Sequence, residues 1–117
     1  MFAALARLFR LKPLEPRWLD IATLRQRLAD DLAPLVVDVR GPDEFDGPLG
    51  HIEGALNIPL PEIPAHRDQI AAAGRPIVCV CLTDKRSSAA AAQLAAAGLA
   101  DVAVLRGGMK AWREAAQ

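Results

Sequence analysis

The stretch that decides the fold runs Pro76-Ile77-Val78-Cys79-Val80-Cys81 and continues as Leu82-Thr83-Asp84-Lys85-Arg86-Ser87. Its first six residues predict a buried strand, residues 82–85 a short polar turn, and the alanine-rich sequence from Arg86 a long helix. Cys81 is therefore expected at the carboxyl end of a strand, facing the start of a helix. Unpaired backbone N–H groups and the helix dipole converge at such a junction and stabilise an anionic sulfur.

We interpret Cys81 as a reactive nucleophile rather than as a small core residue. Cysteines at helix amino termini and beside cations commonly titrate at ~3.5–7.5 instead of ~8.5, which makes the thiolate available at neutral pH. Lys85 and Arg86, directly after the turn, add positive charge at this point.

Composition restricts the function classes. The 117 residues, 52% hydrophobic and 24% charged, suit one compact domain with a single core. The formal net charge is zero, which provides no broad basic surface for nucleic acid. Neither the cysteines nor the scattered His51 and His66 have metal-ligand spacing, so we expect no metal and no cofactor.

The two cysteines, Cys79 and Cys81, are separated only by Val80. A disulfide between them inside a strand would need unfavourable geometry, so we expect free thiols in a reducing, cytoplasmic compartment. Both should point to the same side of the strand. We favour a core-packing role for Cys79, with a resolving thiol as the alternative.

Residues 1–16 are predicted to be an N-terminal extension and residues 17–117 the folded domain, since Pro13 and Pro16 end the first segment. Apolar residues at helical spacing and exclusively basic neighbours make residues 1–12 a candidate amphipathic helix. Such a segment could contact an anionic membrane or be the remnant of a targeting signal. We favour a short helix packed on the domain or a frayed tail.

Strand and helix patterns alternate after residue 18. The expected strands are 35–39, 55–58, 76–81 and 102–105, and the expected helices lie around 21–28, 64–74, from 86 to before Gly98, and 109–116. A loop with one helical turn is expected at 43–54. This alternation predicts an α/β fold with a parallel sheet between helices. Ligands bind outside the carboxyl ends of such strands, where Cys81, Asp38 and Arg40 would lie.

Several segments together resemble the rhodanese family of sulfurtransferases. The matching segments, in order, are Asp38-Val39-Arg40, Glu44-Phe45, Gly50-His51-Ile52, Gly54-Ala55, Asn57-Ile58-Pro59, Cys81 through Ser87, and Gly107-Gly108-Met109 through Ala111-Trp112. The resemblance covers nearly all of Trp18 to Trp112. It implies a rhodanese-like three-layer sandwich with a mostly parallel central sheet of about five strands.

The resemblance also implies a thiosulfate or persulfide sulfurtransferase. Cys81 would accept a sulfane sulfur, rest as a persulfide and pass the sulfur to a thiol or cyanide, with a protein as one possible acceptor. The cradle around the outer sulfur would be Leu82, Thr83, Asp84, Lys85 and Arg86. The cradle would in turn be held in position by residues outside it, namely Asp38, Arg40 and Ser87. His51 is interpreted as fixing a loop, and Asn57 and Trp112 as scaffold.

Loop length favours sulfur over phosphate chemistry. Four residues separate Cys81 from Arg86, whereas the related phosphatases and arsenate reductases have five, which makes a wider ring. Asp84 departs from the glycine that many family members carry. Aspartate tolerates positive φ, so the loop can still form. We expect its carboxylate to point outward or to pair with Lys85 or Arg86.

Two other functions remain open. A protein-binding or regulatory module could keep the fold with little turnover, and Asp84 with the N-terminal segment motivates this reading. A redox switch through Cys79 and Cys81 is the third hypothesis.

Overall fold

A computed structural model describes residues 17–116. The predicted N-terminal extension, residues 1–16, lies outside the described residues. The elements, in chain order, are β1 (Arg17–Leu19), α2 (Ile21–Leu28), β2 (Leu35–Asp38), α3 (Pro42–Phe45), β3 (Leu56–Asn57), a 3-10 turn (Leu60–Glu62), α4 (Ile63–Ala72), β4 (Ile77–Val80), α5 (Lys85–Ala96), β5 (Val102–Leu105) and α6 (Gly108–Ala115).

The central sheet has five strands in the order β1-β5-β4-β2-β3, and every neighbouring pair is parallel. β4 lies in the middle, with Val37 opposite Cys79 on one side and Cys79 opposite Val104 on the other. Because all strands run the same way, their carboxyl ends share one edge of the sheet. The loops after β2 and β4 therefore meet there.

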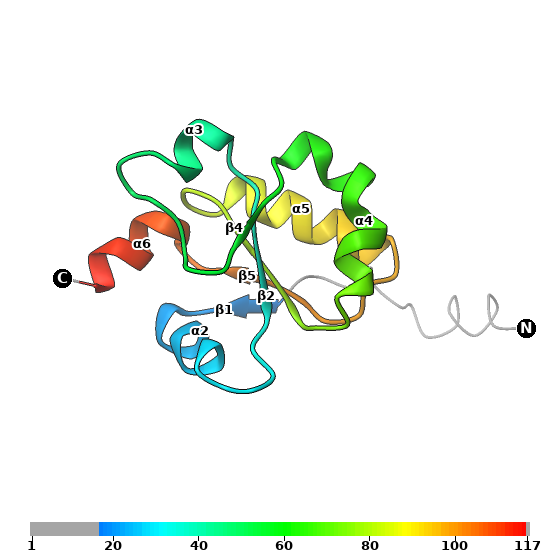
Figure 1. The fold of residues 1–117 in the computed structure, drawn as a ribbon, viewed down its shortest axis with the longest axis horizontal. Helices are drawn as coiled ribbons and strands as arrows, with labels where there is room; N and C mark the ends of the chain where they lie inside the picture. Colours follow the sequence, from blue (N-terminus) through cyan, green and yellow to red (C-terminus); the bar gives the residue numbers. More distant parts are fainter. Residues whose placement is uncertain (1–16, 117) are drawn as a thin grey trace, which may run out of the picture.

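Alternate residues of each central strand face opposite layers. Cys79 and Cys81 face α4 and α5, together with Val37 and Val104. Val78 and Val80 face α2 and α6 instead. Figure 1 shows the α4–α5 pair (green and yellow) and the α2–α6 pair (blue and red) on opposite sides of the strands. The predicted three-layer α/β sandwich is confirmed.

Small side chains bring α5 close to the sheet. Ala90, Ala91 and Leu94 are buried on its inner face, as the alanine-rich pattern predicted. The residues 81–84 between β4 and α5 form a short loop, here called the cysteine loop. Since α5 begins at Lys85, directly after this loop, its first turn is fixed against the end of β4. This packing positions the candidate site.

The sequence prediction missed one strand. β1 has only three residues and pairs at the edge of the sheet with β5, with Arg17 opposite Ala103. Two of its residues are exposed, so it lacks the apolar run that marked the other strands. The remaining predicted elements are present, with ends shifted by one or two residues. Within residues 17–116, no helix is long and apolar enough to cross a membrane.

Candidate functional site

Cys81 lies where β4 ends and faces the first turn of α5. Its Sγ is 3.2 Å from Oγ of Ser87, and the hydroxyl of Ser87 also donates to the carbonyl of Asp84 at 3.1 Å. The thiol can donate to the Ser87 oxygen while that hydroxyl donates to Asp84, and a thiolate would accept from the hydroxyl once its single hydrogen turns from the Asp84 carbonyl to the sulfur. Cys81 and Ser87 are both almost fully buried, with 1% and 0% exposed. Cys81 therefore carries a free thiol that surrounding protein atoms shield from solvent.

The carbonyl groups of the loop after Cys81 point towards α6. Met109 N–H donates to the Cys81 carbonyl at 2.8 Å, and Lys110 N–H donates to the Leu82 carbonyl at 3.0 Å. Gly108 has φ +58°, and a Cβ there would lie 2.6 Å from the Leu82 oxygen and 2.5 Å from that of Thr83. Only glycine lets α6 approach the loop so closely.

The N–H groups of these peptide units lie on the side of the loop opposite to their carbonyl groups. In a trans peptide, the C=O and the following N–H point in opposite directions. The N–H groups of residues 82–84 therefore point away from α6, and those of residues 85–87 are the unpaired first donors of α5. Among residues 17–116, none of these six N–H groups has a hydrogen-bond acceptor. The loop thus presents a ring of free donors at the end of β4, suited to an anion.

Asp84 corrects a prediction. Its carboxylate neither points outward nor pairs with Lys85 or Arg86: Oδ1 accepts a 2.7 Å hydrogen bond from Gly107 N–H, just before α6. Its φ is −133°, so the position requires no left-handed backbone. The negative charge is held at the amino end of α6, where a helix dipole stabilises it.

Arg86 makes a bidentate ion pair with Glu44 of α3. The two nitrogen–oxygen distances are 2.7 and 2.9 Å, and both side chains are partly exposed. The hydrogen bond from Arg86 lowers the pKa of Glu44, and the same bond raises the pKa of Arg86. The pair links the cysteine loop to the loop after β2 and neutralises the Arg86 charge.

Asp38 and Arg40 form a buried pair at the end of β2. Arg40 Nη2 donates to Asp38 Oδ2 at 2.7 Å, and each side chain is 1% exposed. Arg40 also donates to the backbone carbonyls of Glu44 and Gly50. Asp38 in turn accepts from the Arg40 backbone N–H at 3.1 Å. Support of the sulfur site by these two residues stays a prediction, and within the described residues neither makes a hydrogen bond to Cys81.

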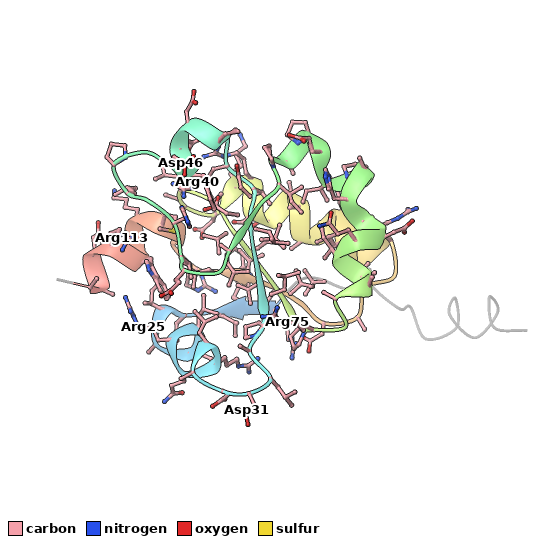
Figure 2. All side chains as sticks on the ribbon, in the orientation of Figure 1. Arg25, Asp31, Arg40, Asp46, Arg75 and Arg113 are labelled. Atoms are coloured by element: carbon pink, nitrogen blue, oxygen red, sulfur yellow. The ribbon has the colours of Figure 1, made fainter. Side chains whose placement is uncertain are left out.

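Two arginines hold the long loop after α3 from different elements (Figure 2). Arg40, two residues after the end of β2, donates to the Gly50 carbonyl at 2.7 Å, and Arg113 of α6 donates to the Leu49 carbonyl at 2.6 Å. His51 stacks on Phe45, with ring centroids 3.6 Å apart, and its Nδ1 lies 2.9 Å from the Phe45 carbonyl. His51 thus holds the loop through Phe45, as interpreted from the sequence, and neither of these contacts involves Cys81.

Cys79 is a core residue on the same side of β4. It is 0% exposed, and burial raises the pKa of its thiol to about 12, with the nearby Cys81 adding to the effect. Both cysteines are free. A neutral, enclosed thiol is a poor nucleophile, so the core-packing interpretation of Cys79 has a physical basis.

A hollow of about 160 Å³ lies beside the cysteine loop, lined by Arg40, Glu44, Pro48, Leu49 and Leu82. Its rim is mostly apolar, and Leu82 is 39% exposed. Lys85 is also exposed at the start of α5. Larger hollows of about 510 and 470 Å³ are lined by other residues, away from Cys81. Within residues 17–116, no three His, Cys, Asp or Glu side chains are grouped to bind a metal.

Sequence reasoning assigned no role to Glu44 or Gly108. Glu44 stood in a matching segment, and a carboxylate in a loop rich in glycine and proline could have signalled a partner for Arg86. Gly108 also stood in a matching segment, but only the packing of α6 against the cysteine loop shows why a side chain is excluded there.

Comparison with known proteins agrees with this architecture. Residues 20–115 match the family described as "Rhodanese-like domain". YqhL of Bacillus subtilis, an uncharacterised protein, is 39% identical over 77 residues, which are 66% of this chain and 59% of YqhL. The chain thus spans less than two thirds of this relative. The thiosulfate sulfurtransferase GlpE of Shewanella oneidensis is 40% identical over 80 residues, 68% of this chain and 76% of GlpE.

A solved structure gives the same result in three dimensions. The human single-domain sulfurtransferase superposes with a TM-score of 0.69 at 28% identity, covering 85% of this chain and 96% of the human one. The family match alone extends over most of the described residues. The family match, the five-stranded parallel sheet and the cysteine loop between β4 and α5 all agree. This chain belongs to the rhodanese-like domain family.

Proposed function

We propose that this protein is a sulfurtransferase that carries a sulfane sulfur on Cys81. The observation that carries the proposal is the ring of unpaired N–H groups from residues 82–87 next to the Cys81 side chain. Such donors stabilise a single anionic atom, and the outer sulfur of a persulfide is one. Relatives described as thiosulfate sulfurtransferases support the same activity class.

The reaction has two steps in which sulfur moves as a neutral atom. The Cys81 thiolate attacks the outer sulfur of thiosulfate, its S–S bond breaks, and sulfite leaves with the electron pair. Cys81 then holds a persulfide anion. A thiolate or cyanide attacks the terminal sulfur, which regenerates the Cys81 thiolate and releases a persulfide or thiocyanate. A low-molecular-weight persulfide can replace thiosulfate as donor, with a thiolate as the leaving group.

The residues divide this work between them. Ser87 contacts the sulfur directly, and Leu82 through Arg86 supply the donors. Asp38, Arg40 and Glu44 hold the neighbouring loops. Lys85 at the exposed rim attracts an anionic donor. We assign this activity to residues 17–117 and place the protein in the cytoplasm, where free thiols persist.

The first experiment is intact-mass measurement after incubation with thiosulfate. We expect the addition of one sulfur atom to the wild type and none to Cys81→Ser. Cys79→Ala is the matched control and should still gain sulfur. Absence of the mass increase in the wild type, or its persistence in Cys81→Ser, would exclude Cys81 as the carrier.

One observation favours a second candidate, a protein-binding module with little turnover. Cys81 is only 1% exposed, so the protein atoms that shield its sulfur must move before a donor can reach it. Steady-state turnover with thiosulfate and cyanide separates the two candidates. A rate comparable to that of an active rhodanese excludes the module, and sulfur loading without turnover supports it.

A further inference from the structure

We propose that Asp84 is a positioning residue for sulfur transfer, because its carboxylate fixes the cysteine loop to the start of α6. This inference rests on the proposed function of Cys81. It concerns the one acidic side chain among residues 82–87, whose N–H groups form the ring of free donors. By sequence alone, this carboxylate would oppose a persulfide anion three positions away.

Three hydrogen bonds join the loop to the beginning of α6. Gly107 N–H donates to Asp84 Oδ1 at 2.7 Å. Met109 N–H and Lys110 N–H donate to the carbonyls of Cys81 and Leu82 at 2.8 and 3.0 Å. Asp84 provides the only side chain among these three acceptors. It also provides the only charge, and hydrogen bonds to charged groups are the stronger ones.

These bonds set the direction of the free donors. The carbonyls of residues 81 and 82 are held towards α6, so the N–H groups of residues 82 and 83 are turned to the opposite side. The bond from Gly107 fixes Asp84 itself, at the point where the loop becomes α5. Without it, the last peptide groups of the loop would lose their anchor and their N–H groups would reorient.

Asp84 is also connected to the sulfur through Ser87. The backbone carbonyl of Asp84 accepts from the Ser87 hydroxyl at 3.1 Å, and that hydroxyl lies 3.2 Å from Cys81 Sγ. One residue thus links Gly107 to the hydroxyl that contacts the nucleophile. A displaced Asp84 would change the orientation of that hydroxyl as well as the direction of the amides.

The charge of Asp84 is compensated by α6 rather than by its basic neighbours. Arg86 is engaged by Glu44, and Lys85 is exposed. The Gly107 N–H and the amino end of α6 provide the compensating positive potential. The carboxylate therefore lies on the α6 side of the loop, and the free N–H groups lie on the other. This separation reconciles an aspartate with an anionic sulfur in one short loop.

Three substitutions separate geometry from charge. Asp84→Asn keeps an oxygen that can accept from Gly107, Asp84→Ala removes the acceptor, and Asp68→Ala removes a carboxylate from the exposed surface of α4 as a control. The maximal rate of single-turnover sulfur loading should fall about tenfold in Asp84→Ala and about threefold in Asp84→Asn. The half-saturating donor concentration should stay within about twofold, because the donor is not contacted. Asp68→Ala should match the wild type.

Two measurements test the positioning without sulfur transfer. The backbone amide signal of Gly107 in NMR spectra should move upfield in Asp84→Ala and by less in Asp84→Asn. The rate of Cys81 alkylation by neutral iodoacetamide at pH 7, measured in a Cys79→Ala background, should fall in the order wild type, Asn, Ala. Thermal unfolding of each variant shows that the comparison is made on folded protein.

The outcomes are decisive in each case. An unchanged Gly107 signal, an unchanged alkylation rate in Asp84→Ala, or an Asp84→Asn variant as impaired as Asp84→Ala would overturn the positioning role. A wild type that never gains sulfur would overturn the proposed function instead. The NMR and alkylation series would then still decide whether Asp84 positions the loop around Cys81.

Discussion

Arg86 donates from both terminal nitrogens to the carboxylate of Glu44, across 42 positions in the sequence. The Arg86 charge beside the cysteine loop is therefore neutralised before any donor arrives. The small hollow beside it has a mostly apolar lining that includes Leu49 and Leu82, and its other cation, Arg40, is paired with Asp38. The positive potential for an anionic donor comes from backbone N–H groups and from the exposed Lys85 at the start of α5.

Replacing Glu44 by Gln should improve the use of anionic donors. The neutral amide leaves the Arg86 charge uncompensated, so the KM for thiosulfate should fall about threefold to tenfold at low salt. The KM for an uncharged organic persulfide precursor should change by less than about twofold. Steady-state kinetics at about 20 and 200 mM salt measure both effects. An equal KM change for both donors, or no dependence on salt, would contradict this electrostatic explanation.

The same ion pair should contribute to acid unfolding. The pKa of Glu44 lies below its ordinary value of 4.5 because Arg86 stabilises the carboxylate. A depressed folded pKa means that the stabilisation is present above pH 4.5 and is lost as pH falls through the folded value. The pair is partly exposed, so about 1 kcal/mol is the expected scale.

Denaturant unfolding of the wild type and Glu44→Gln from pH 7 to pH 3 checks this. The wild type should be the more stable at pH 7, and the difference should shrink as the pH falls below 4.5. Asp68→Ala controls for general charge effects, since that carboxylate is exposed on α4. A difference that grows towards low pH would show that the sign is wrong.

Gly108→Ala should disrupt the cysteine loop. Its φ of +58° disfavours any side chain, and the added Cβ would overlap with the carbonyl oxygens of Leu82 and Thr83. Gly98→Ala is the matched control, because Gly98 has φ +100° but no atom within 4 Å of the added Cβ. We expect a loss of about 1 kcal/mol for Gly98→Ala and more than about 3 kcal/mol for Gly108→Ala.

Chemical denaturation and sulfur loading measure these two variants. Gly98→Ala should load sulfur at the wild-type rate, whereas any folded Gly108→Ala should load it more than about tenfold more slowly. Equal losses of stability in the two variants would mean that strain, and not the approach of α6 to the loop, explains the glycine.

Cys79 should take no part in sulfur transfer. Burial raises the pKa of its thiol to about 12, so the folded protein holds the neutral form at neutral pH. Cys79→Ala should gain sulfur as fast as the wild type and lose about 1 kcal/mol of stability through the deleted atom. Thiol counting before and after mild oxidation should find two free thiols both times. A lost pair of thiols would support the redox hypothesis.

The raised pKa of Cys79 also predicts an alkaline effect. Unfolded Cys79 ionises at about 9.0, whereas the folded protein resists ionisation up to about 12. The stability of the wild type relative to Cys79→Ala should therefore fall as pH rises above 9.0. Unfolding titrations between pH 7 and pH 10.5 measure this difference; a constant difference would contradict burial as the cause.

The sequence by itself determined the class of fold and the position of the nucleophile. Apolar runs such as Leu35–Asp38 and Ile77–Val80 specify central parallel strands, because only buried strands tolerate apolar residues on both faces. The alternation with helices, the cysteine at the end of β4 and the alanine-rich α5 all follow from local patterns. Edge strand β1 does not follow from such a pattern, since two of its three residues are exposed and the strand is stabilised by pairing with β5.

Only the tertiary structure decided the partners within the site. Arg86 pairs with Glu44 of α3, and Asp84 accepts a hydrogen bond from the Gly107 amide before α6. Neither interaction joins residues that are neighbours in the sequence. Side-chain partners depend on which loops meet at the carboxyl edge of the sheet and on the approach of α6 permitted by Gly108. Contacts between segments distant in sequence leave no local periodic pattern, so the chain must fold before these pairs exist.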